Sequence, residues 1–218
     1  MPTARSIALD VLRRSRLREG FASDLLDEQL AATPLSSLDR RLALQFVLGM
    51  VRRKATLDAL IAPHLTRPFS ETHPDTLDLL RLGAFQLGLL NQIPAHAAVH
   101  ETVELAPPMV KKFINAILRR VADSIGSEYC DFPGPRSLPV APGEYRILNT
   151  PAFYDPRNDF PAYFAAAFSW PFWLAKRWFE THGPDETIRL GFWFNEPPLL
   201  ALRVNANRTN RDDYLKSL

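Results

Sequence analysis

The sequence predicts a mainly α-helical protein: a helical bundle over residues 1–126, a connector over 127–168, and the start of an α+β module over 169–218. Three observations lead to this prediction. Apolar residues recur at helical spacing in the first zone, prolines and aromatic residues crowd the second, and the third combines helical patterns with a short apolar run. The first zone carries no convincing hairpin signal, which favours an all-α bundle there.

Capping residues and prolines divide the first zone into successive helices. Thr3 caps the first, the second stops near Pro34, Ser37 opens the third, and the fourth ends near Pro63. Apolar residues at helical spacing fill each of these segments. The later helices run from Pro74 to Leu90, from Pro94 to the pair Pro107-Pro108, and from Met109 to Ser124.

The helix over residues 74–90 is predicted to lie at the centre of the bundle. Pro74 suits the first helical position, and Asp75 suits the positive end of the helix. Apolar residues occur on nearly all of its sides, which is typical of a buried helix. Gly83 and Gly88 each cost about 1 kcal/mol relative to alanine, so we expect a neighbouring helix to cross closely there.

The connector over residues 127–168 is rich in proline, which lacks an amide donor and has a fixed φ. We therefore expect it to avoid both helix and central strand. It is also rich in aromatic residues, unlike most disordered linkers, so we expect much of it to pack along the helical zone. The residues concerned are Pro133, Pro135, Pro139, Pro142, Pro151, Pro156, Pro161, Tyr145, Phe153, Tyr154, Phe160, Tyr163, Phe164 and Phe168.

The third zone is predicted to contain helices and one strand. Pro171 opens a helix that Gly183 ends, and a second helix runs from Pro184 to about Phe194. Leu199–Val204 has the character of a strand, and Asn210 caps a final helix over residues 212–218. A strand without a partner is a poor place to end a fold, so we expect the sequence to be part of a longer protein.

Composition restricts the class of protein. Hydrophobic residues make up 46% and charged residues 23%, which is ordinary for a globular protein. The single cysteine, Cys130, cannot form an intramolecular disulfide, which fits the cytoplasm better than secretion. The sequence has neither an apolar run long enough to span a membrane nor a signal-peptide pattern at its start.

Clustered basic residues are the main indication of a ligand. Guanidinium groups match phosphate oxygens, so each cluster is a candidate surface for nucleic acid. A solvated helix face explains such a run equally well when it is taken alone, and that alternative stays open. The clusters are Arg5, Arg13, Arg14, Arg16 and Arg18; Arg52, Arg53 and Lys54; and Lys111, Lys112, Arg119 and Arg120.

Other polar and aromatic residues favour structural roles. His96 and His100 have i,i+4 spacing but lack a third ligand, so we expect no metal site. The nine glycines include no Gly-x-Gly turn for a dinucleotide-type cofactor. We expect Asn115 to bond a neighbouring backbone, Glu101 and Glu104 to cap or pair within the bundle, and Trp173, Trp178 and Trp193 to be core residues.

Several segments together resemble the NusB family of helical RNA-binding domains over about residues 4–123. Their order and spacing carry the resemblance, although the pair Pro107-Pro108 departs from the usual loop. The segments are Ala4–Leu12 (ARSIALDVL), Asp39–Leu44 (DRRLAL), Leu79–Leu87 (LLRLGAFQL), Ile93-Pro94, Val99–Ala106 (VHETVELA) and Phe113–Arg120 (FINAILRR).

A second group of segments resembles the intermediate domain of bacterial 16S ribosomal RNA cytosine-C5 methyltransferases of the RsmB (Fmu, Sun) type. This resemblance implies a further domain that binds S-adenosylmethionine and carries two catalytic cysteines, so we expect no cofactor and no catalytic residue in this chain, Cys130 included. The segments are Ser169–Leu174 (SWPFWL), Lys176–Trp178 (KRW), Asn195–Asn205 (NEPPLLALRVN) and Thr209–Leu215 (TNRDDYL).

Together the resemblances imply binding of ribosomal RNA, with no DNA and no membrane as partner. By analogy with NusB-like domains, the favoured contacts are Arg5, Arg13 and Arg14, then Lys111, Lys112, Arg119 and Arg120. Arg52–Lys54 are weaker candidates, and Arg203 and Asn205 are others. Two alternatives remain: a non-catalytic transcription antitermination factor and a protein-interaction module. A homodimer also stays open.

Overall fold

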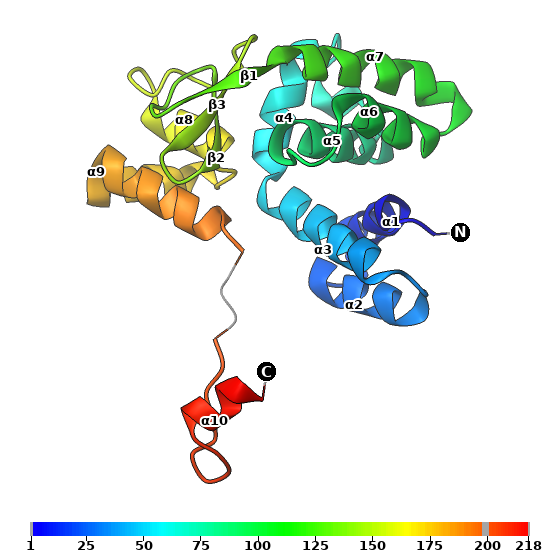
Figure 1. The fold of residues 1–218 in the computed structure, drawn as a ribbon. Coiled ribbons are helices and arrows are strands. Elements are labelled where there is room, and N and C mark those ends of the chain that lie inside the picture. Colours follow the sequence, from blue (N-terminus) through cyan, green and yellow to red (C-terminus); the bar gives the residue numbers. More distant parts are fainter. Residues whose placement is uncertain (1, 198–200, 218) are drawn as a thin grey trace.

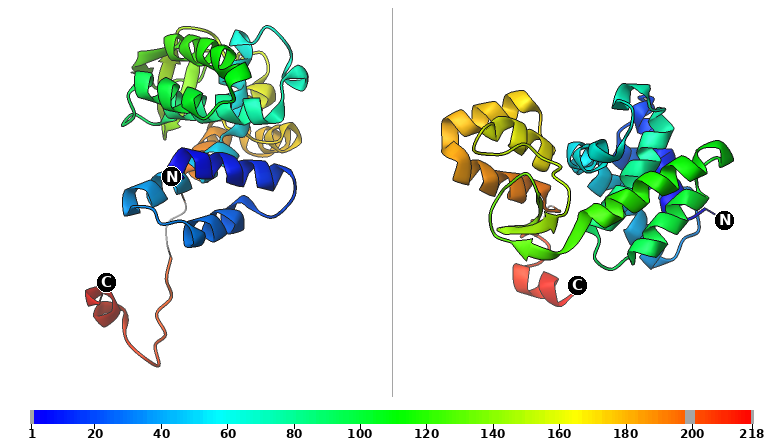
Figure 2. Two further views of the ribbon diagram at one scale, coloured as in Figure 1. Left: turned by 90° about the vertical axis from the view of Figure 1, so that its right-hand side faces the viewer. Right: turned by 90° about the horizontal axis from the view of Figure 1, so that it is seen from above.

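A computed structural model describes residues 2–197 and 201–217, and Figure 1 shows their arrangement. The chain forms a helical bundle and a smaller α+β unit, which lie side by side (Figure 2). The described helices are α1 (Ala4–Arg16), α2 (Ala22–Ala32), α3 (Ser37–Arg52), α4 (Lys54–Ile61), α5 (Pro74–Leu89), α6 (Ala95–Glu104), α7 (Pro108–Ser124), α8 (Phe160–Ala167), α9 (Phe172–Asn195) and α10 (Arg211–Lys216), with 3₁₀ turns η1 (Ala62–His64) and η2 (Phe69–Glu71) and strands β1 (Ile125–Cys130), β2 (Ser137–Ala141) and β3 (Glu144–Leu148).

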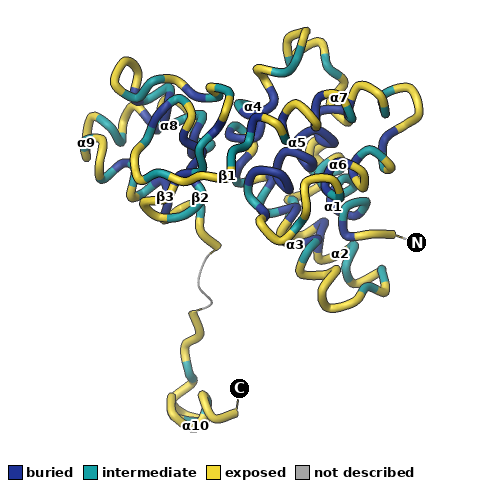
Figure 3. Tube along the Cα trace, turned by 45° about the horizontal axis from the view of Figure 1, so that its top comes forward, coloured by how far each residue is buried: buried dark blue, intermediate teal, exposed yellow. Residues whose placement is uncertain are grey.

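The bundle is built around α5, as predicted. Nearly every residue of α5 is buried (Figure 3), and α1, α3, α4, α6 and α7 all pack against it. The predicted cap at Thr3 is confirmed, because its side chain accepts a hydrogen bond from the Ser6 amide in a capping box. Ser36, one residue before the predicted Ser37, caps α3 in the same way. The prediction of an all-α first zone is therefore confirmed.

Three strands and a helix form within residues 125–168, and β3 is a central strand, so the prediction that the connector avoids helix and central strand is wrong. The strands pair antiparallel in the order β1-β3-β2, and α8 follows them. Pro139 lies in β2, an edge strand, where a missing amide donor is tolerated. Pro161 lies in the first turn of α8, where the amide has no partner within the helix. Pro139 and Pro161 therefore occupy positions at which a strand or helix does not need a backbone amide donor.

The connector aromatics form a second hydrophobic core instead of lying along the first one. Its largest fully buried side chains include Tyr145, Tyr163, Phe164 and Phe168. Leu60 of α4 belongs to this second core, although its neighbours on α4 face the first. The expectation that these aromatics pack against the helical zone holds only where they contact α4.

Helix α9 bends where the sequence predicts one helix to end and another to begin. Gly183 has a φ of 74°, and Pro184 opens the second arm. Trp178 packs between Trp170 and Phe194, with ring centroids at 4.9 and 5.5 Å. The prediction that Trp173 and Trp193 are core residues is wrong. These two residues are 64% and 66% exposed, because they lie on the outer sides of the two arms of α9.

The secondary structure of residues 201–217 agrees only in part with the prediction. The Asn210 side chain caps α10 as expected. Leu199 and Leu200 lie outside the described residues. Residues 201–204 form no strand in the part of the chain that the structure describes, because no neighbouring strand pairs with them there. Arg203 and Asn205 are exposed in this segment.

Replacing Gly83 with alanine is expected to destabilise the bundle. An added Cβ would lie 2.4 Å from the nearest methyl carbon of Leu118, which is fully buried and would have to shift within the core. Overpacking typically costs about 1–3 kcal/mol, which exceeds the gain of about 1 kcal/mol in helix propensity. Urea unfolding followed by circular dichroism should show a loss of about 1 kcal/mol.

Gly88→Ala is the matched control for this prediction. It lies on the same helix, but its added Cβ would meet its nearest neighbours, Leu138 and Leu60, at 3.3 and 3.4 Å. The same gain in helix propensity should therefore leave the free energy of unfolding unchanged or raised. Equal stabilisation by Gly83→Ala and Gly88→Ala would contradict the close crossing of α5 and α7.

Candidate nucleic-acid interface

The outer face of α7 carries the basic cluster that is least neutralised by acids. Ile114, Leu118 and Val121 anchor the opposite face in the bundle core. Lys112, Arg119 and Arg120 are exposed, and among the described residues none of them forms an ion pair. Lys111 differs, because its Nζ lies 3.0 Å from Glu104 Oε2. The α7 face, defined as Lys112, Arg119 and Arg120, can therefore bind an anion without first breaking an ion pair.

His64 lies beside this face, where α7 contacts η1. Burial lowers the pKa of His64, and the charge of Arg120 lowers it further, while Asp123 acts in the opposite direction. His64 is therefore a natural reporter of the charge on this part of α7.

Arg13 and Arg14 of α1 are already paired with acids. Arg13 Nη2 lies 3.1 Å from Asp10 Oδ1, and Arg14 bonds Glu19 and Glu28 at 2.9 and 3.2 Å. The hydrogen bonds that Arg14 donates to Glu19 and Glu28 raise the pKa of Arg14. These contacts leave α1 less positive than its sequence indicates.

Arg16 also turns toward the bundle. It bonds Asp75 and lies 3.3 Å from Asp78, both on α5. A shallow hollow between α1 and the turn before α7 is lined by Asp10, Asp75 and Asp78. Arg13 lines the same hollow, so acids and a basic side chain of α1 lie together there.

Arg5 is half-buried within the bundle. Its Nε donates a hydrogen bond to Gln86 Oε1 at 2.8 Å, and its guanidinium lies 5.7 Å from the centroid of the Phe46 ring. Burial lowers its pKa, and the charge of Glu101 opposes that effect. These contacts give Arg5 a structural role, whether or not it also meets a ligand.

The three basic residues at the junction of α3 and α4 have different surroundings. Lys54 is exposed, Arg52 is half-buried at the rim of a groove, and Arg53 is buried. Arg53 Nη2 donates to Pro139 O at 2.8 Å, which links the bundle to β2. Burial lowers the pKa of Arg53 to about 10. Arg53 is therefore a buried link between the bundle and β2, whereas its neighbours Arg52 and Lys54 face solvent.

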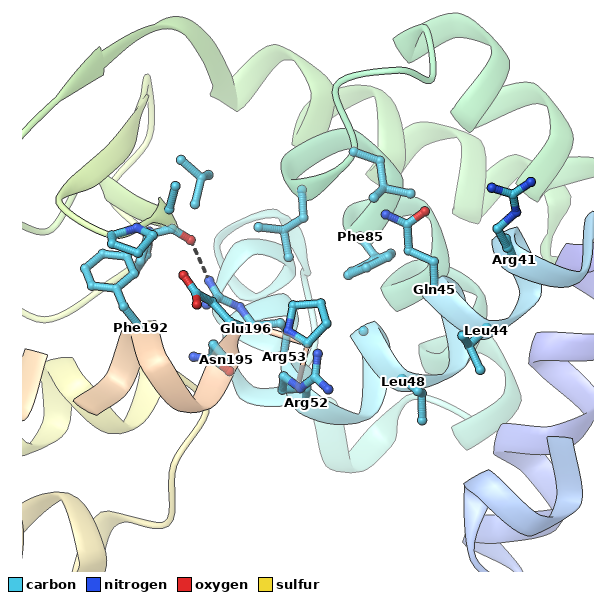
Figure 4. A pocket seen from close by; sticks show the side chains of 18 residues that line it. Arg41, Leu44, Gln45, Leu48, Arg52, Arg53, Phe85, Phe192, Asn195 and Glu196 are labelled. Atoms are coloured by element: carbon cyan, nitrogen blue, oxygen red, sulfur yellow. Dashed lines mark hydrogen bonds between the residues drawn. The ribbon is translucent and has the colours of Figure 1, made fainter. Parts of the chain in front are cut away.

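A groove of about 670 Å³ lies between the bundle and the second unit, and the sequence interpretation missed it. Figure 4 shows Arg41, Gln45 and Arg52 of α3 on one side, and Phe192 and Glu196 at the end of α9 on the other. Apolar side chains of α3, α5 and β2 line the space between them. The only signal in the sequence was the spacing of Arg41 and Arg52 along one helix.

The structure gives the remaining candidates ordinary surroundings. His96 and His100 are exposed on α6, and among the described residues no three His, Cys, Asp or Glu side chains cluster as a metal site would require. Asn115 is half-buried, with no side-chain hydrogen bond found for it within residues 2–197 and 201–217. Cys130 Sγ lies 3.6 Å from Phe132 O. In the described parts of the chain, no helix is long and apolar enough to cross a membrane.

Family models match both parts of the chain. The NusB family model matches residues 2–123, which correspond to the bundle. A model of the ferredoxin-like domain of RsmF/B-like methyltransferases matches residues 170–218. The fold and these matches define the class, a NusB-type helical domain followed by a domain found in methyltransferases.

Similar proteins agree with this assignment. The chain is 33% identical over 224 residues to the probable ribosomal RNA small subunit methyltransferase B of Synechocystis sp., covering 100% of this chain and 44% of the relative. It is 28% identical over 216 residues to the protein of the same name from Bacillus subtilis, covering 99% and 43%. It is 30% identical over 122 residues to the transcription antitermination protein NusB of Shewanella loihica, covering 54% and 91%.

The chain belongs to the NusB family, and its residues 170–218 are similar to the ferredoxin-like domain of RsmF/B-like methyltransferases. It spans less than half the length of the two methyltransferases that it matches. The resemblances to the NusB family and to ribosomal RNA methyltransferases of the RsmB type are therefore confirmed.

Arg120→Ala is expected to raise the pKa of His64 because it removes a neighbouring positive charge. The pKa should stay below the ordinary value, since burial of the imidazole, the larger cause, is unchanged. An NMR titration of the His64 ring protons measures the shift. An unchanged or lower pKa would mean that Arg120 does not lie close to His64.

Proposed function

We propose that this chain is the RNA-binding N-terminal portion of an S-adenosylmethionine-dependent ribosomal RNA (cytosine-C5) methyltransferase, and that it recruits structured ribosomal RNA. The observation that carries the proposal is the α7 face on a domain of the NusB family. Its three cations are exposed and lack acid partners among the described residues. Phosphate binding there releases counterions without first breaking an ion pair.

Lys111 is proposed as a further phosphate contact at the edge of the α7 face. Its pairing with Glu104 is exposed, and an exposed ion pair contributes little. Arg5, Arg13 and Arg14 are proposed as weaker contacts, because each already has an internal partner. Specificity would come from RNA shape and from unpaired bases.

The catalytic step would take place in a further part of the complete enzyme. Methylation at C5 of cytosine needs a thiolate that attacks C6, and a base that later removes the C5 proton. Cys130 is the one thiol of this chain, and it is half-buried in β1, within the second unit. We propose that S-adenosylmethionine binds outside this chain, so calorimetry with this chain alone should give no binding heat.

The alternative function is that of a non-catalytic antitermination or protein-interaction module. The antitermination relatives support it, since they cover the NusB part at 30% identity or slightly less. They cover only 54–56% of this chain, however, and the second core has no counterpart in matches of that length. A stable complex with a protein partner and no RNA affinity at low salt would favour this alternative.

Reversing charge on α7 is expected to weaken RNA binding strongly. Lys112→Glu with Arg119→Glu should lower affinity for a ribosomal RNA helix with an unpaired loop at least tenfold, because two phosphate contacts become repulsive. The plot of log affinity against log salt concentration should become shallower, with the magnitude of its negative slope reduced by about 2. Fluorescence anisotropy at several salt concentrations measures both. Unchanged affinity would reject the α7 face as the RNA contact.

Reversing charge on α1 is expected to have a smaller effect. Arg13→Glu and Arg14→Glu, each made singly, should reduce affinity less than the α7 double variant, because both arginines are already neutralised by acids. The same anisotropy assay applies, with circular dichroism to verify folding. A loss as large as that of the α7 variant would place α1 at the centre of the interface.

A further inference from the structure

We infer that the groove between α3 and the end of α9 binds an unpaired segment of the RNA. This inference rests on the proposed function in taking RNA as the ligand. It adds a second site, which lies on different elements from the α7 face. Its volume of about 670 Å³ is that of a ligand cleft, which admits unpaired nucleotides but not a duplex.

Charge at the rim of the groove indicates an anionic ligand. Arg41 and Arg52 lie 11 residues apart on α3, which corresponds to about 16 Å along a helix. Among the described residues neither guanidinium pairs with an acid. Two such groups on one side of the groove suit two non-adjacent phosphates of a single extended strand.

The interior of the groove suits the bases of such a strand. Leu48 and Leu89 line it with other apolar side chains, against which the faces of bases can pack. Gln45 places an amide between the two arginines, where it can bond a base edge. Apolar surface between cationic ends matches the alternation of base and phosphate in a nucleic acid.

Glu196 distinguishes RNA from an acidic peptide as the occupant. It is exposed at the opposite rim and, among the described residues, forms no ion pair. A carboxylate there can accept hydrogen bonds from the amino group of a base such as cytosine, a donor that the side chains of an acidic peptide lack. The observations therefore favour unpaired RNA with amino-bearing bases.

The test measures binding of fluorescein-labelled, unstructured 10-nucleotide oligo(C) and oligo(U) to the whole chain. Arg41→Glu with Arg52→Glu should weaken oligo(C) binding at least tenfold. The matched control is Lys176→Glu with Arg177→Glu, which changes net charge equally at exposed positions that do not line the groove. The control should change oligo(C) affinity less than twofold.

A second variant separates base recognition from overall charge. Glu196→Gln removes a negative charge, so general electrostatics would raise affinity for both oligonucleotides. Loss of the amino-group contact should instead lower the ratio of oligo(C) to oligo(U) affinity at least threefold. An unchanged ratio, with unchanged affinity in the Arg41 and Arg52 double variant, would overturn the inference.

The outcomes distinguish this inference from the proposed function. Binding of a structured RNA that depends on Lys112 and Arg119, without binding of either oligonucleotide, would overturn the groove inference alone. No affinity for any RNA would reject both. Tighter binding of an alternating glutamate–leucine peptide than of oligo(C), lost in the Arg41 and Arg52 double variant, would make the groove a protein-docking site and overturn the inference.

Discussion

The burial of α4 from both sides is the constraint on which the rest of the structure depends. Leu57 and Ile61 belong to the core of the bundle, whereas Leu60, on the same short helix, belongs to the second core. The Thr56 hydroxyl donates to Ala167 O at 3.0 Å, and the Ala55 amide donates to the Ser169 hydroxyl at 2.8 Å. These two bonds join α4 to the end of α8 and to the turn that follows it. They hold the two units, and so the two sides of the groove, in fixed positions relative to each other.

Internal electrostatics determine which cations remain for a ligand. Arg81 on α5 is almost buried and bonds Asp58 and Asp78 at 2.7 and 3.0 Å. Burial alone lowers the pKa of Arg81, but the hydrogen bonds and charges of Asp58 and Asp78 together outweigh it and raise the pKa. Asp78 in turn attracts Arg16 of α1. The acids of α5 thus engage Arg16 of α1, whereas among the described residues no acid pairs with the α7 face.

Much of the bundle was predictable because helices are local. Caps, prolines and apolar spacing located α1 to α7, and the glycines of α5 indicated the close crossing that Leu118 makes at Gly83. The sequence did not predict the sheet, because closely spaced prolines usually interrupt helices and strands, whereas Pro139 lies in an edge strand. The pairing of Arg16 with acids of α5 and the burial of Arg53 depend on partners distant in sequence, and no local pattern reveals them. The groove was missed for the same reason, since its walls meet only after folding.

The most direct test of the account is to map ultraviolet crosslinks between this chain and small-subunit ribosomal RNA by mass spectrometry. The account predicts crosslinked peptides from the outer face of α7 and from the exposed side of α3 that borders the groove. Few crosslinks are expected at α2 and α6, which contribute neither surface. Crosslinks confined to α1, α2 and α6, or none above the level of an unrelated acidic protein, would contradict the claim that this NusB domain grips RNA through α7.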